Sequence, residues 1–281
     1  MSAHTTFGIG GPVDIFVEPA GEADLAQAVS MVRQAGAPLF TVGSGSNLLV
    51  SDEGIEGVVI RILENLSSVE RVGDVLRAEA GVVMDDLCDR ALQESLSGLE
   101  RFAGIPGTVG GAVYMNAGAF GEEVLGVVGE VRVLDEMGRW LTLSPDQIQR
   151  GYRHTALMDS GAIVTGADFL LRQGSKGEIA AQMEEVRAHR CARIPAGARC
   201  AGSVFKNPKP EAAGRLLDQA GCKGLAVGGA VVSELHANVI LNQGGATAAE
   251  VLALMREMRQ RVRDRVGLEL QPEVILKGVT L

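Results

Sequence analysis

Glycine is the residue that most constrains the fold of this chain. It makes up 37 of 281 residues, about 13%, whereas soluble domains average about 7%. Every glycine raises the entropy cost of ordering the backbone, so a folded chain keeps this many only where turns or close backbone contacts need them. Two segments, 42–50 and 98–121, concentrate glycine. The second includes the longest stretch without a charged residue, Phe102–Gly121, whose six glycines and Pro106 argue against a membrane-spanning helix.

Composition excludes several classes of protein. Hydrophobic residues make up 46% of the chain and charged residues 22%, as in ordinary globular proteins. A net charge of −9 and only 4% aromatic residues argue against binding to nucleic acids or anionic membranes. The length predicts two domains, with one large or three small domains as alternatives. The four cysteines form no C-x-x-C pair and the N-terminus resembles no signal peptide, so we expect free thiols, no metal site and a cytoplasmic protein.

Hydrophobic periodicity predicts a mixed α+β fold. Apolar residues recur at helical spacing in four segments, and β-branched runs bounded by turn residues mark the strands. Thr247 and Glu250 form a capping-box pattern before the longest expected helix, which Gly267 ends. The expected helices are 23–35, 85–96, 176–190, 211–220 and 248–266, and the expected strands are 13–17, 38–42, 58–62, 128–134, 163–171, 237–241 and 273–277.

The first glycine-rich segment, Val42–Val50, follows an expected strand. Its successive backbone N–H groups carry little side-chain bulk and can form an anion-binding nest for a diphosphate. It lacks the Gly-Lys-Ser/Thr of a Walker loop, and its spacing is not that of a Rossmann fingerprint. Taken alone, a tight turn between strands explains it about as well.

The second segment, 98–121, is harder to explain as a set of turns. Close backbone approach to a large, flat, partly apolar ligand that carries phosphates accounts better for so much glycine in an uncharged stretch. Together, the two segments predict a binding site for one extended dinucleotide without a Rossmann fold.

Four further motifs accompany the two glycine-rich segments. In this combination and order, over nearly the whole chain, the sequence resembles the UDP-N-acetylenolpyruvoylglucosamine reductase (UDP-N-acetylmuramate dehydrogenase) family. With only two tyrosines, Tyr114 and Tyr152, it resembles the shorter form that lacks a tyrosine-bearing loop over the substrate. The motifs are His4-Thr5-Thr6-Phe7 with Gly10-Gly11-Pro12, Gly202-Ser203-Val204-Phe205-Lys206-Asn207-Pro208, Ser233-Glu234-Leu235-His236-Ala237-Asn238, and Pro272-Glu273-Val274.

The resemblance implies a particular fold and reaction. The fold would be the FAD-binding fold of the vanillyl-alcohol-oxidase-like (PCMH-type) group plus a C-terminal α/β substrate lobe. We expect FAD-binding lobes at 1–63 and 64–190, a substrate lobe at 191–268, and a C-terminal strand within 269–281 that returns to the second lobe. In the implied reaction, NADPH reduces bound FAD, which then reduces UDP-N-acetylglucosamine-enolpyruvate to UDP-N-acetylmuramate for peptidoglycan synthesis, and hence for cell wall biogenesis, cell shape and cell division. We also expect a monomer.

The resemblance assigns catalytic roles to three residues. Ser203 would donate the proton, with Lys206 near in sequence to stabilise the alkoxide. Arg153 can hold a carboxylate by two parallel hydrogen bonds and offset charge that develops as hydride arrives. Glu273 would polarise the site, either kept neutral by burial or paired with Arg153. The other implied site residues are Tyr152, Lys206 and Asn207 for the substrate, and Gly43, Ser44, Gly45, Ser46, Asn47, Leu48, Gly104, Ile105, Thr108, Gly110, Gly111, Asn116, Ala117 and Gly118 for the cofactor.

Simpler roles remain open for single residues. A serine hydroxyl often just bonds to a turn, and a lone arginine or glutamate is usually a surface residue. We expect His236 and Asn238 to shape a turn or contact the nucleotide weakly. For the whole chain, the alternatives are another FAD oxidoreductase or oxidase of the same fold, and a non-enzymatic nucleotide-binding protein.

Overall fold

The computed structural model describes residues 1–281 and divides the chain into two compact units. Unit 1 contains Met1–Asp14, Gly45–Glu56 and Arg190–Leu281, and unit 2 contains Ile15–Ser44 and Gly57–His189. These units do not follow the three expected lobes, because the chain changes unit inside the first glycine-rich segment. No helix in the structure has the length and apolar character needed to cross a lipid bilayer.

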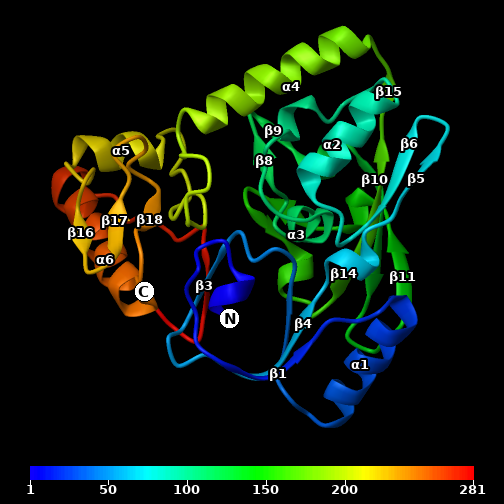
Figure 1. The fold of residues 1–281 in the computed structure, drawn as a ribbon, viewed down its shortest axis with the longest axis horizontal. Helices are drawn as coiled ribbons and strands as arrows, with labels where there is room; N and C mark the ends of the chain where they lie inside the picture. The colour runs from blue at the N-terminus through cyan, green and yellow to red at the C-terminus, as the bar shows by residue number, and fades with distance from the viewer. The chain divides into compact units, whose positions relative to one another are not determined.

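A five-stranded antiparallel sheet, in the order β11-β10-β14-β6-β5, forms the centre of unit 2 (Figure 1). Its middle strand is buried along all but its last residue. Helices on this unit share one hydrophobic core with the sheet, because their apolar faces recur at helical spacing. The elements are β5 (Val69–Val72), β6 (Val75–Glu79), β10 (Val128–Leu134), β11 (Trp140–Leu143), β14 (Ile163–Leu170), α2 (Met84–Gln93), α3 (Val109–Tyr114) and α4 (Lys176–Cys191), with the short pairs β7 (Leu96–Ser97) and β15 (Arg172–Gln173), β8 (Gly118–Ala119) and β9 (Glu122–Glu123), and β12 (Arg150–Gly151) and β13 (His154–Thr155).

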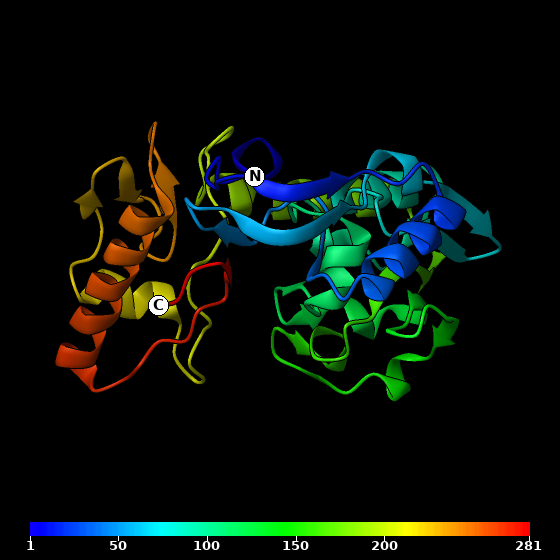
Figure 2. The same cartoon turned by 90° about the horizontal axis from the view of Figure 1, so that it is seen from below.

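A smaller sheet precedes this one in the sequence. Its strands β1 (Val13–Val17), β4 (Ile55–Arg61) and β2 (Leu39–Val42) lie in that order, with β2 parallel to β4. Helix α1 (Glu22–Gln34) runs alongside this sheet (Figure 2). It buries Leu25, Val29 and Val32 in a core shared with Val58 and Ile60, so the predicted amphipathic helix is confirmed.

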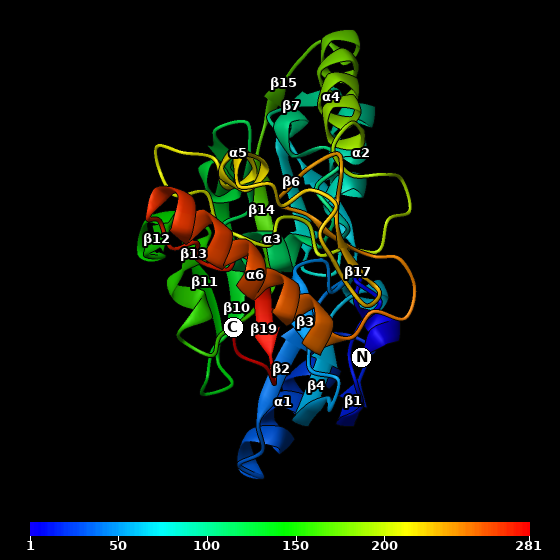
Figure 3. The same cartoon turned by 90° about the vertical axis from the view of Figure 1, so that its left-hand side faces the viewer.

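Unit 1 packs two helices with short strands around a second core that includes Phe7, Phe205 and Met255. Its strand β19 pairs in parallel with β3, so Ile275 lies opposite Leu48 (Figure 3). The C-terminal strand therefore does not return to residues 64–190 as expected, because the apolar run Leu48–Val50 provides its partner. The elements are β3 (Leu48–Val50), α5 (Ala213–Gln219), β16 (Ala226–Val227), β17 (Ala230–Val232), β18 (Ile240–Asn242), α6 (Ala248–Val266) and β19 (Ile275–Lys277).

Helix α6 has the predicted ends. The Thr247 hydroxyl accepts a hydrogen bond from the Glu250 N–H at 3.2 Å, and the Glu250 carboxylate accepts one from the Thr247 N–H at 3.1 Å. The Asp52 carboxylate accepts two more of the free N–H groups at this end, which the sequence did not indicate. Gly267 ends the helix at a φ of 71°.

Several elements differ from the expectations. The helix expected over 85–96 ends at Gln93, because Ser95 adopts a φ of 56° and Leu96 joins β7. The strand expected over 237–241 is β18, shifted to Ile240–Asn242. Helix α3 and the β5–β6 hairpin, which turns at Gly73, were not expected at all.

Candidate active site

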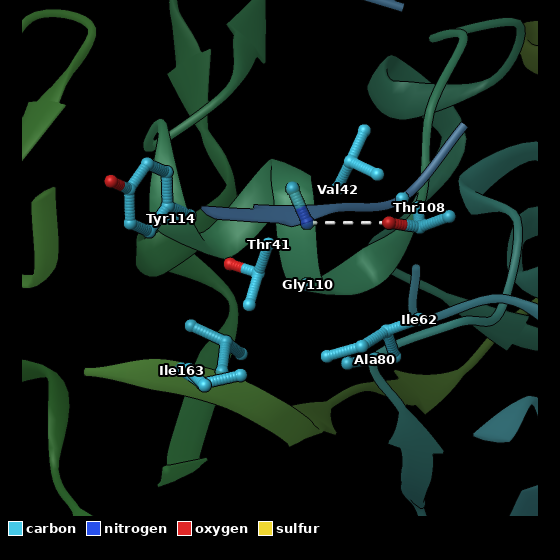
Figure 4. A pocket seen from close by; sticks show the side chains of 11 residues that line it. Thr41, Val42, Ile62, Ala80, Thr108, Gly110, Tyr114 and Ile163 are labelled. Carbon is cyan, nitrogen blue, oxygen red and sulfur yellow. Dashed lines mark hydrogen bonds between the residues drawn. The ribbon is translucent and has the colours of Figure 1, made fainter. Parts of the chain in front are cut away.

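In unit 2, the two glycine-rich segments meet at Gly43 and Thr108. A Cβ atom on Gly43 would lie 2.4 Å from the Thr108 hydroxyl oxygen, so only glycine allows this approach. Thr108 also caps α3, because its hydroxyl accepts a hydrogen bond from the Gly111 N–H at 3.3 Å (Figure 4). Gly110 is similarly restricted, since its Cβ would lie 2.9 Å from the Cβ of Ala80. The predicted proximity of the two segments is therefore observed in this unit.

A pocket opens beside this contact, between β2, α3 and β14 (Figure 4). None of its lining residues is charged, and most are apolar or glycine. Four of them, Gly43, Thr108, Gly110 and Gly111, were predicted to bind the cofactor. Tyr114 lies within the second glycine-rich segment but was not singled out, and the apolar lining residues of the strands look like ordinary core in the sequence. The lining residues are Thr41, Val42, Gly43, Ile62, Ala80, Thr108, Gly110, Gly111, Tyr114, Ile163 and Val164.

Ser44 follows directly after the pocket residue Gly43. Its hydroxyl oxygen is buried and has no hydrogen-bond partner in the structure. Buried polar groups are nearly always hydrogen-bonded, so this hydroxyl is suited to a ligand oxygen. The uncharged, mostly apolar pocket suits the flat rings of a dinucleotide such as FAD, and the Ser44 hydroxyl next along the chain suits its phosphate oxygens.

The remaining predicted cofactor residues of unit 2 lie along the same glycine-rich segment. The Gly104 N–H donates to the Asp85 carboxylate at 2.7 Å, and the Ile105 N–H donates to the Phe102 carbonyl oxygen at 3.0 Å. Ala117 is half-buried, and its carbonyl oxygen accepts from the Val124 N–H at 2.8 Å. These bonds fix the course of the backbone on either side of α3.

Asn116 is fully buried and faces its own unit. Its side-chain amide donates to the Glu123 carboxylate at 2.7 Å and to the Gly151 carbonyl oxygen at 3.3 Å. Its side-chain oxygen accepts from the Leu125 N–H at 3.3 Å. Asn116 therefore connects the glycine-rich segment to the β12–β13 hairpin.

That hairpin carries Arg153 at its turn. Arg153 has a backbone φ of 55°, which residues other than glycine rarely adopt. Its guanidinium donates to the Gly118 carbonyl oxygen at 2.6 Å and lies over the Tyr152 ring, 4.9 Å from the ring centre. The structure thus brings the predicted catalytic arginine and Tyr152 to the end of the second glycine-rich segment.

In unit 1, the segments that carry Ser203 and Glu273 lie side by side. The Glu273 N–H donates to the Val204 carbonyl oxygen at 2.8 Å, and the Lys206 N–H donates to the Gln271 carbonyl oxygen at 2.8 Å. Ser203, Lys206 and Glu273 are all half-buried. Two predicted catalytic residues and the predicted charged neighbour are therefore close in the backbone framework.

The first glycine-rich segment joins this framework through Asn47. Its side-chain amide donates to the Glu273 carbonyl oxygen at 3.1 Å. Gly45 approaches the N-terminal segment, since its Cβ would lie 2.3 Å from the His4 carbonyl oxygen. Ser46 is half-buried and Leu48 is buried in β3.

The Asn207 side chain forms a hydrogen bond that stabilises the start of a helix. Its side-chain oxygen accepts from the Ala213 N–H at 2.9 Å and so satisfies the start of α5. Cys200, three residues before Ser203, is buried, and burial raises the pKa of its thiol. That shift keeps the thiol protonated and makes it a poor nucleophile.

Comparison with known proteins assigns the two halves of the chain. An FAD binding domain family matches residues 13–144, and the C-terminal domain family of UDP-N-acetylenolpyruvoylglucosamine reductase matches residues 194–277. The enzyme of that name from Heliobacterium modesticaldum is 46% identical over 99% of this chain and 89% of its own length. Its counterpart from Clostridium botulinum (strain Alaska E43 / Type E3) is 40% identical over 99% of this chain and 91% of its own length.

A solved structure agrees with the sequence comparisons. The crystal structure of UDP-N-acetylenolpyruvylglucosamine reductase (MurB) from Thermus caldophilus has a TM-score of 0.85 and 37% identity, covering 98% of this chain and 96% of that chain. The expected FAD-binding fold with a C-terminal lobe is therefore confirmed. With this identity over almost its full length, the chain belongs to the UDP-N-acetylenolpyruvoylglucosamine reductase family.

Proposed function

We propose that the protein is an FAD-containing, NADPH-dependent reductase that converts UDP-N-acetylglucosamine-enolpyruvate to UDP-N-acetylmuramate. The observation that carries this proposal is the 46% identity to an enzyme of this name over 99% of the chain. The uncharged pocket lined by Gly43, and the buried, unpartnered hydroxyl of the next residue, Ser44, support FAD as the cofactor. Ser44 and the glycines at 43, 110 and 111 would hold it.

The proposed chemistry adds a hydride and a proton to one carbon–carbon double bond. The hydride transfer, from NADPH to the enolpyruvyl group, is the chemistry that bound FAD supplies. Arg153 would hold the enolpyruvyl carboxylate and offset the negative charge that spreads into it as the hydride arrives. Its fixed position against Gly118 and Tyr152 limits the reorganisation that this requires.

The proton completes the reaction at the neighbouring carbon. The Ser203 hydroxyl would donate it, with the positive charge of Lys206 favouring the alkoxide that remains until solvent returns a proton. Glu273 would polarise the developing enolate from the adjacent segment through a hydrogen bond, which requires a protonated carboxyl group because a carboxylate would repel the enolate. Tyr152, Lys206 and Asn207 would contact the substrate.

The cellular setting follows from the proposed substrates. NADPH and UDP-N-acetylglucosamine-enolpyruvate are both soluble phosphorylated metabolites, so we place the reaction in the cytoplasm. It would be a step of peptidoglycan precursor synthesis that serves cell wall biogenesis, cell shape and cell division. We propose that the enzyme acts as a monomer, which light scattering of the purified protein tests.

The decisive experiment follows NADPH oxidation by the purified flavoprotein without oxygen. Oxidation beyond one equivalent of flavin only when UDP-N-acetylglucosamine-enolpyruvate is present would support the reductase. Flavin that is reduced once and stays reduced would point to another acceptor, such as oxygen in an oxidase. A protein that neither binds added FAD nor oxidises NADPH would leave a nucleotide-binding role.

A further inference from the structure

Asn238 holds the residues that follow the proposed proton donor. It is 2% exposed and lies just before β18. The Phe205 N–H donates to the Asn238 side-chain oxygen at 3.0 Å, and the Asn238 side-chain amide donates to the Phe205 carbonyl oxygen at 2.8 Å. The Val204 N–H donates to the Asn238 backbone carbonyl oxygen at 2.9 Å.

These bonds replace a partner strand. A side-chain amide presents one donor and one acceptor, so it can pair with a peptide as a neighbouring strand would. Ser203 lies opposite Val239 in a single bridge, and Phe205 lies opposite Pro272 on its other edge. The segment from Ser203 to Phe205 is therefore held between Asn238 on one side and the Glu273 segment on the other.

His236 fixes Asn238 in turn. The Asn238 N–H donates to Nδ1 of His236 at 3.2 Å. The imidazole packs on α5, where a Cβ on Gly214 would lie 2.8 Å from its Cε1 atom. Burial, and then the charges of Arg193 and Lys223, lower the pKa of His236 against an opposing effect of Asp218, so the ring remains a neutral acceptor.

We propose that Asn238 is a positioning residue for proton delivery, which orients the Ser203 hydroxyl by fixing the Phe205 peptide. This inference rests on the proposed function of Ser203. Asn238 acts through the backbone, so its loss should slow the proton-dependent half of the reaction and spare the reduction of flavin by NADPH.

The test compares two substitutions at Asn238 with matched substitutions at Asn242. Asn242 is also a buried amide of unit 1, which donates to the Phe7 carbonyl oxygen at 3.0 Å and accepts from the Gly244 and Ala246 N–H groups. It touches neither Val204 nor Phe205 in these bonds. Asn238→Ala removes both side-chain bonds, and Asn238→Asp keeps the shape and the acceptor if the alanine variant fails to fold.

Anaerobic stopped-flow measurements give the two half-reactions separately. We expect Asn238→Asp to slow flavin reoxidation by UDP-N-acetylglucosamine-enolpyruvate roughly tenfold or more, and to change flavin reduction by less than about twofold. Asn242→Asp should leave both rates within about twofold of wild type, even where its thermal stability falls equally. The solvent deuterium isotope effect on flavin reoxidation should be larger in Asn238→Asp than in the wild type, because proton transfer becomes rate-limiting.

The pH profile adds a signature that a purely structural role would not give. A protonated aspartic acid can again donate to the Phe205 carbonyl oxygen, whereas the carboxylate cannot. The deficit of Asn238→Asp relative to wild type should therefore shrink as the pH falls. Equal slowing by the Asn242 variants, or reoxidation at the wild-type rate in Asn238→Asp at every pH, would overturn the proposal.

Ser203→Ala, measured in the same assay, distinguishes a failure of the positioning role of Asn238 from a failure of the proton-donor role of Ser203. If it slows reoxidation while Asn238→Asp does not, only the positioning role fails. If Ser203→Ala reoxidises at the wild-type rate, the proton-donor assignment fails and the positioning role fails with it.

Discussion

The side-chain amide of Asn47 donates a hydrogen bond of 3.1 Å to the backbone carbonyl oxygen of Glu273, and the Asn47 carbonyl oxygen accepts one from the Ile275 N–H at 3.0 Å. One residue of the first glycine-rich segment thus holds the backbone on both sides of Val274. The position of the glutamate is set by the segment proposed to hold the cofactor.

Asn47→Ala should therefore affect both stability and catalysis. We expect it to cost about 1 kcal/mol of unfolding free energy, the usual net loss for one hydrogen bond. Reoxidation of the flavin should slow because the Glu273 segment is less well fixed. Urea unfolding and stopped-flow kinetics measure these effects. Asn65→Ala is the control, since it removes a similar amide-to-carbonyl bond, to Pro19, in unit 2; equal slowing in both variants would refute the link.

Ser44→Ala should separate apoprotein stability from cofactor binding. The Ser44 hydroxyl has no partner to lose, so the apoprotein should unfold at the same urea concentration or a slightly higher one. The FAD dissociation constant should rise roughly tenfold, the value of one hydrogen bond to a charged oxygen. Thr165→Val is the control, because the Thr165 hydroxyl is also buried without a partner but belongs to the central strand β14 and not to a glycine-rich segment. Similar FAD affinities for both variants would argue against a role of Ser44.

Arg153 should be irreplaceable by lysine. A lysine cannot form two parallel bonds to a carboxylate, so Arg153→Lys should lower kcat/KM for the UDP-sugar on the order of a hundredfold. The rate of flavin reduction by NADPH, measured on the same variant, should stay close to the wild-type rate. Arg150→Lys is the control within the same hairpin, where the arginine donates to the Leu125 carbonyl oxygen. Wild-type turnover in Arg153→Lys would count against carboxylate recognition.

His236 should make the protein less stable in acid. Burial, and then Arg193 and Lys223, lower its pKa below the usual value of 6.5, so the unfolded chain binds the proton more readily than the folded one. This contribution is absent well above pH 6.5 and becomes destabilising as the pH falls below that value. Urea unfolding of wild type and His236→Gln across this range measures it. The pH dependence should be weaker in His236→Gln than in the wild type; equal dependence in the two proteins would contradict the prediction.

The sequence predicted the long elements well because their signals are local. The α6 helix carries its capping box at one end and its terminal glycine at the other, and α1 carries a clear apolar stripe. Helix α3 was not predicted because Gly110 and Gly111 have low helix propensity. In the folded protein, packing on β14 and β6 overrides that low propensity. The shift of β18 has a different cause, since the Asn238 side chain takes over pairing that the strand pattern assigned to the backbone.

The candidate site was only partly predictable for a similar reason. Motif residues such as Ser203 and Glu273 were identified, but no local pattern indicates that Val204 and Glu273 share a hydrogen bond. Ile62 and Ile163 line the pocket through long-range packing, and their sequence neighbourhoods resemble any core segment. Asn238 was expected to shape a turn or contact the nucleotide weakly. It does lie in a turn, which the Val239 N–H closes on the His236 carbonyl oxygen at 3.0 Å, but its two bonds to Phe205 exist only after folding.

The interleaving of the two units has a consequence for how the chain is made. Every residue of unit 2 has been synthesised once His189 is added, so its core can form while the ribosome is still working. Unit 1 must wait, because β3 cannot gain its partner until β19 is translated. During that interval Leu48–Val50 is an apolar strand without its partner on a nascent chain, which exposes it to pairing with the wrong strand.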